Sequence, residues 1–170
     1  MMSTENIKNH HSATTNIFAM GMALKKMYEM GRKDFDSENF AGLKLSCCKL
    51  TAISLRCADL SGADLDLTDL SGADLRKANF EQATLSFTNL KGADLSNANL
   101  KGVNLGGADL TGANLRGAIL QNANLRGANL SKTCLEFADL QDADLTGANC
   151  FECDLTNANL KNADLSDVNF

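Results

Sequence analysis

The sequence predicts an all-β domain, a four-sided parallel β-helix that follows a helical cap, and two regularities support this prediction. Every fifth residue from Phe40 to Phe170 is Leu or Phe at 26 of 27 positions, and the exception is Cys150. Two residues before each of these positions stands a small or medium residue, most often Ala, with Asp or Asn usually between the two. The repeated unit is therefore A-(D/N)-L-x-x, and no insertion breaks its register.

A five-residue period matches neither the helical period of about 3.6 residues nor the strand period of about two, so the chain must turn once per unit. If each unit forms one side of a square, its Ala and Leu point inward and the two x positions form the corner. Four units then close one coil, and coils stacked about 4.8 Å apart amount to about 6 to 7 coils. Gly at the second x position suits a corner that needs positive φ. The predicted structural core contains Leu60, Leu65, Leu75, Phe80, Leu95, Leu100, Leu110, Leu115, Leu125 and Leu130.

Residues 58–170, and more loosely residues 40–57, resemble the pentapeptide repeat family through copies such as Ala58-Asp59-Leu60. The resemblance implies that the β-helix is a right-handed quadrilateral solenoid. Quinolone-resistance relatives dimerise through their C-terminal coils, so the resemblance also implies an end-to-end homodimer. A chain that simply stops within its repeats is the alternative.

The chain is expected to divide into three parts. Residues 1–13 are polar and are expected to be a disordered tail. Residues 14–39 carry apolar residues at helical spacing and then Gly31, which predicts a capping helix and turn over the first coil. Within this part, residues 24–35 resemble the helix and glycine turn that precede the first coil in cyanobacterial members, which points to a bacterial source. Residues 40–170 form the predicted β-helix.

Composition and charge narrow the class of partner. The formal net charge of -5 and the pI near 4.9 argue against a nucleic-acid partner, which a basic face would bind. No apolar stretch is long enough to cross a membrane, and no leader peptide is evident, so we expect a cytoplasmic protein without a membrane partner. The six Cys are then expected to be reduced thiols.

No residue pattern indicates chemistry. Each Asp occupies the same position of the repeat, which favours a structural role over acid or base catalysis. Cys150 and Cys153 have C-x-x-C spacing, but both fall on inward positions and are interpreted as small buried hydrophobes. No cysteine or histidine has partners at zinc spacing. We therefore expect no catalytic residue, no cofactor and no metal, and we expect that the protein is not an enzyme.

Two surface features are candidates for binding an unknown protein partner. Leu67 and Phe87 occupy the same corner in successive coils and could form an apolar patch, unless the N-terminal segment covers it or the corner merely tolerates apolar residues. Arg56, Arg76 and Arg116 form a basic stripe on a neighbouring face.

The preferred hypothesis for function is a protein interaction module or scaffold that uses the outer faces of a rigid rod. One alternative, implied by the resemblance, is a DNA mimic that inhibits or protects a type II topoisomerase. The repeat region holds 16 acidic and 11 basic residues, which is a modest excess of negative charge for a DNA mimic. The other alternative is a structural protein without a specific partner.

Overall fold

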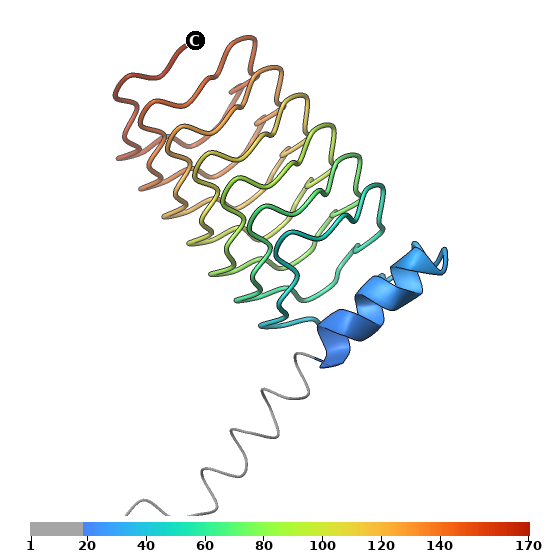
Figure 1. The fold of residues 1–170 in the computed structure, drawn as a ribbon. Helices are drawn as coiled ribbons and strands as arrows, with labels where there is room; N and C mark the ends of the chain where they lie inside the picture. The colour runs from blue at the N-terminus through green and yellow to red at the C-terminus, as the bar shows by residue number, and fades with distance from the viewer. Residues whose placement is uncertain (1–18) are drawn as a thin grey trace, which may run out of the picture.

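The computed structural model describes residues 19–170, which form one helix followed by a stack of coils (Figure 1). The helix spans residues 19–29. In the part that follows, each side of a coil contributes one isolated bridging residue and no longer strand. Among the described residues, none of the helical structure is long and apolar enough to cross a membrane. The predicted disordered tail, residues 1–13, lies outside the described residues.

The bridges establish a four-sided coil with a period of 20 residues. All of them are parallel and join each residue to the one 20 positions later, from Asp34 with Ser54 to Asn149 with Asn169. The bridging positions recur every five residues, so four sides complete one turn of the coil. Between Asp34 and Asn169 there are 28 such positions, which amount to seven coils.

The coil begins one unit earlier than the predicted boundary at residue 40. Asp34 already bridges Ser54, and the Phe35 side chain points inward and is 1% exposed. The boundary was wrong because Lys33 stands where the repeat normally has Ala, which hides this first unit in the sequence. The predicted cap and turn therefore contribute their last six residues, 34–39, to the coil.

The interior is a column of Leu and Phe lined by small residues. All ten residues of the predicted core are buried. Three of the small positions carry Thr, and each buried hydroxyl donates a hydrogen bond to a carbonyl 23 residues earlier, as Thr88 Oγ1 does to Leu65 O at 2.8 Å. Among the described residues, no buried side-chain nitrogen or oxygen lacks a hydrogen-bond partner. The core is therefore apolar without leaving a polar group unsatisfied.

Every corner uses a left-handed residue. The second corner residue has positive φ at all 27 positions from Ser37 to Asp167, although only ten of these residues are Gly. A backbone hydrogen bond closes each four-residue turn, as Leu43 N donates to Phe40 O at 3.1 Å. Positive φ at the third residue is typical of a type II turn and favours Gly. The fold therefore imposes this conformation on 17 other side chains that disfavour it.

The Asp and Asn residues between the inward positions serve both the corner and the stack. Asp59 Oδ1 accepts a hydrogen bond from Ser61 N at 3.0 Å, which holds the corner that follows. The same oxygen accepts a hydrogen bond from Asn79 Nδ2 of the next coil at 3.0 Å. Side-chain ladders thus run along the outside of the walls, beside the backbone ladder.

Acid should destabilise this arrangement. Hydrogen bonds lower the pKa of Asp59, mainly through Ser61 N, and of Asp144 and Asp164, mainly through the Thr146 and Ser166 side chains. A carboxyl whose folded pKa is lowered contributes stability above its ordinary pKa of about 3.9 and loses it as pH falls through the folded value. We expect the urea midpoint to be constant from about pH 7 to pH 5 and to fall below about pH 4.

The matched variant combines Asp59→Asn, Asp144→Asn and Asp164→Asn. Asn keeps the Oδ1 acceptor but does not titrate, and Asn99 Nδ2 already donates to Asn79 Oδ1 at 2.9 Å in the same ladder. The urea midpoint of this variant should therefore fall less with acid than that of the natural sequence. An identical fall in both proteins would contradict the assignment of acid sensitivity to these carboxylates.

The N-terminal helix packs on the first coil. Leu24 is fully buried and belongs to the same core as the coil interior, and Met27 and Tyr28 pack against it. The helix closes at Gly31, whose φ is 98°, where Gly31 N donates to Tyr28 O at 2.9 Å and Arg32 N to Met27 O at 3.0 Å. This pair of hydrogen bonds is the Schellman motif, which satisfies carbonyls at a helix end.

Candidate interaction surface

Leu67 and Phe87 form an exposed apolar stripe along one corner of the coil. Their side chains are 60% and 67% exposed, and both residues have the positive φ of the second corner position. Cys47, at the same corner one coil earlier, is exposed as well. The Phe87 ring lies over Gly107 of the following coil, because a Cβ atom at Gly107 would meet the ring at 2.5 Å. We name Cys47, Leu67 and Phe87 the corner stripe.

The predicted basic stripe is not a free positive surface. The structure places Arg56, Arg76 and Arg116 on one wall, but acidic side chains of the same wall lie between them. The ion pairs join Arg56 to Asp36 at 4.0 Å and to Asp74 at 3.9 Å, Arg76 to Asp74 at 2.5 Å and to Asp94 at 3.8 Å, and Arg116 to Glu136. Exposed ion pairs contribute little stability each. Their effect here is to balance the charge of the wall.

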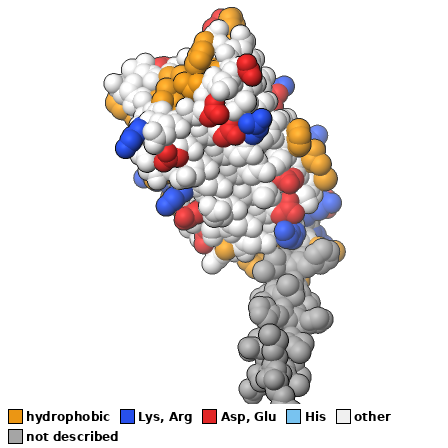
Figure 2. Space-filling model, turned by 90° about the vertical axis from the view of Figure 1, so that its left-hand side faces the viewer, with side chains coloured by type: hydrophobic (Ala, Val, Ile, Leu, Met, Phe, Trp, Pro, Cys, Tyr) orange, Lys and Arg blue, Asp and Glu red, His pale blue; other side chains and the backbone are white. Residues whose placement is uncertain are grey.

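The space-filling view shows the same interspersion over the wall that faces the viewer, where acidic and basic side chains alternate (Figure 2). Apolar side chains gather at the C-terminal end of the coil, at the top of this view. In the last coil the inward residues have no following coil over them, and Leu165 and Phe170 are 36% and 64% exposed.

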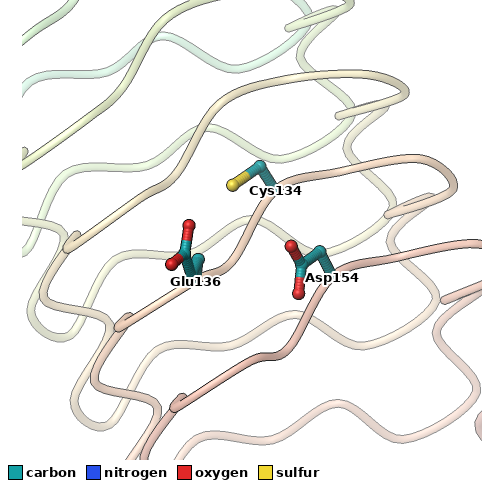
Figure 3. Close-up of side chains that lie close together, drawn as sticks. All are labelled: Cys134, Glu136 and Asp154. Carbon is teal, nitrogen blue, oxygen red and sulfur yellow. The ribbon is translucent and has the colours of Figure 1, made fainter.

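A second group of side chains converges near the far end of the wall, where Cys134, Glu136 and Asp154 point toward one another (Figure 3). Their sulfur and carboxylate oxygen atoms lie within 4.8 Å of one another. Such a set could supply three ligands to a divalent cation. However, the Arg116 guanidinium forms an ion pair with Glu136 and lies 4.9 Å from the centre of the Phe137 ring.

Arg116 already provides the positive charge that a metal ion would bring. Hydrogen bonds from Thr156 lower the pKa of Asp154, and Arg116 lowers it further, so this carboxylate is ionised within an established charge network. We therefore interpret the group as an ion-pair cluster. Sequence reasoning missed it, although Cys134 and Asp154 occupy the same repeat position one coil apart.

The C-x-x-C pair lies in the last turns of the interior. Cys150 is 2% exposed, and Cys153 is partly buried and packs against the core. Burial raises the pKa of the Cys150 thiol to about 12, so this group is neutral at physiological pH. A neutral buried thiol is a poor nucleophile and a poor metal ligand.

A groove of about 510 Å³ separates the N-terminal helix from the first coil. Its lining residues are Lys25, Tyr28, Glu29, Cys47, Cys48 and Lys49. Sequence reasoning missed this groove because it depends on how the helix docks on the coil. The available signal was Lys44 and Lys49, which stand at the repeat position that usually carries Asp or Asn.

Comparison with known proteins gives one family. The model of pentapeptide repeats matches the chain with eight copies, over residues 39–72, 78–117, 108–147 and 148–170. No curated protein sequence matches the chain.

Solved structures similar to the chain are pentapeptide repeat proteins from plants and bacteria. A protein of the Arabidopsis thaliana thylakoid lumen is 32% identical with a TM-score of 0.40, and the match covers 60% of this chain and 64% of that one. Rfr23 of the cyanobacterium Cyanothece 51142 is 26% identical with a TM-score of 0.49, over 88% of this chain and 99% of that one. QnrB1, a plasmid-mediated fluoroquinolone resistance protein, is 21% identical with a TM-score of 0.46, over 79% of this chain and 90% of that one.

Proposed function

The chain belongs to the pentapeptide repeat family, whose fold is a right-handed quadrilateral β-helix, and on this basis we propose that it is a non-enzymatic protein interaction module. The module binds its partner through the outer surface of a rigid coil. The observation that carries the proposal is the corner stripe. Leu67 and Phe87 expose most of their apolar surface on consecutive coils of one edge.

The stripe is costly unless another molecule covers it. Positive φ disfavours a Leu or Phe residue, and neither side chain gains burial within the described residues in return. Partly exposed aromatic and aliphatic side chains on a rigid support are the usual anchors of protein interfaces. We therefore infer that Phe87 inserts into an apolar pocket of the partner protein and that Leu67 extends the contact along the edge.

The charge distribution supports this function over a DNA mimic. A DNA mimic needs an extended surface of negative charge, whereas the Arg side chains of one wall are paired with Asp and Glu along its length. The scaffold with a specific partner is also preferred to a purely structural rod, because a rod without a partner gains nothing from adjacent apolar corners.

The experiment compares affinity capture from a lysate of the source organism by the natural sequence and by Leu67→Lys/Phe87→Lys. We expect a protein that the natural sequence retains and the variant loses, because two charges at the contact disrupt an apolar interface. Phe87→Ala alone should then weaken binding of the purified partner about tenfold or more in titration calorimetry.

The matched control is Gln82→Lys/Asn122→Lys, which adds the same charge at second corner positions on another edge. It should retain the partner at full affinity. All four substitutions are at the surface and should leave the free energy of unfolding within about 1 kcal/mol of the natural value. Equal loss in both double variants, or no retained protein, would refute an interface at the corner stripe.

A further inference from the structure

The groove between the N-terminal helix and the first coil is held open at both ends of the helix. At one end a Cβ atom on Gly21 would lie 2.9 Å from Lys44 O, so only glycine allows this close approach of helix and coil. At the other end Tyr28 Oη donates a hydrogen bond to Thr51 O at 2.8 Å. The helix is thereby fixed against the coil, and the groove of about 510 Å³ is preformed and within the range of ligand sites.

Positive charge concentrates at this end of the molecule. Residues 19–49 contain six Lys and Arg against four Asp and Glu, whereas residues 50–170 contain nine against sixteen. Lys25 and Lys49 line the groove, and neither forms an ion pair with any of the described residues. Glu29 is the acidic residue of the lining. The groove therefore carries an excess of positive charge beside an otherwise acidic coil.

The coil side of the groove is an open β edge. Among residues 19–170, Lys49 N has no hydrogen-bond acceptor and Lys49 O has no donor. One coil later the equivalent groups are both paired, because Asp69 N donates to Cys48 O at 2.9 Å and Asp69 O accepts from Leu50 N at 2.8 Å. An unpaired N–H and C=O on an edge offer hydrogen bonds to an added strand.

We propose that this groove binds an extended acidic peptide segment of a partner protein. The segment pairs its backbone with the edge at Lys49, and its carboxylates lie near the ammonium groups of Lys25 and Lys49. Lysines are separate point charges that suit spaced carboxylates, whereas a single phosphate group is better matched by the planar fork of Arg. The site is independent of the corner stripe, so the failure of one leaves the other standing.

The test measures fluorescence anisotropy with a fluorescein-labelled peptide of four Glu-Val repeats and the full chain. We expect saturable binding that weakens about tenfold in Lys25→Gln/Lys49→Gln, because two cations that face the carboxylates are removed. Glu29→Gln should tighten binding, since it removes the acidic residue of the lining. The matched control Lys101→Gln/Lys161→Gln changes the net charge equally on another wall and should bind as the natural sequence does.

The backbone contact has its own readout. The same peptide with N-methyl groups on its Val residues keeps every carboxylate but loses N–H donors, and it should bind several-fold more weakly. Inorganic phosphate at the peptide's concentration of charge should not displace the labelled peptide. Equal affinity of groove and control variants, unchanged binding of the methylated peptide, or efficient displacement by phosphate would each overturn the proposal.

Discussion

Leu100→Ala should lower the free energy of unfolding by about 2 to 5 kcal/mol. Leu100 is fully buried, and the inward residues of the adjacent coils on the same side, Phe80 and Leu120, are fully buried too. A cavity at this point interrupts a column that the backbone ladders hold at fixed spacing, so the walls cannot collapse to fill it. Urea denaturation followed by circular dichroism measures the loss.

The matched control is Leu165→Ala, the same change at the same repeat position in the last coil. Leu165 is already 36% exposed, so the substitution removes less buried surface and leaves no closed cavity. Its cost should stay below about 1 kcal/mol. Equal losses in the two variants would contradict a packed interior at Leu100.

A proline should break the coil on a side and be tolerated at a corner, although the natural sequence contains none. Asn99→Pro removes the N–H that donates to Ala78 O at 2.9 Å and should cost about 3 kcal/mol or more. Lys101 N, by contrast, donates only to the Asn99 side chain, at 3.2 Å.

Lys101 is also the second residue of a turn that Val103 N closes onto Leu100 O at 3.1 Å, with Gly102 at positive φ in the third place. Proline followed by glycine is the preferred pair at these two places of a type II turn. Lys101→Pro should therefore change the free energy of unfolding by less than about 1 kcal/mol. A loss as large as that of Asn99→Pro in urea denaturation would mean that the corner backbone has another conformation.

The sequence was sufficient to predict the coil because each unit repeats its own instructions. Leu60, Ala58 and Asp59 report inward, spacer and corner-binding roles within five residues, and their recurrence fixes the four-sided geometry. The first unit was missed where Lys33 replaces the small residue. Its Phe35 is nevertheless buried, because the N-terminal helix and the coil cover it together.

Contacts between coils were harder to predict than the coils themselves. Arg56 pairs with Asp74, which lies 18 residues later, whereas the walls were compared by steps of 20 residues. Asp36, its other partner, belongs to the unit that the sequence hid. The groove at Lys25 and Lys49 required the docking of the helix, which no repeat pattern specifies.

The regular corners also limit which partners can follow the molecule along its length. Equivalent corners recur at the spacing of paired strands, about 4.8 Å, whereas successive turns of a helix recur at about 5.4 Å. A partner helix laid along an edge would therefore lose step with the corners by about 0.6 Å per coil and would be out of phase after about four coils. A stripe confined to neighbouring coils, as at Leu67 and Phe87, stays within the length over which a helix and this edge remain matched.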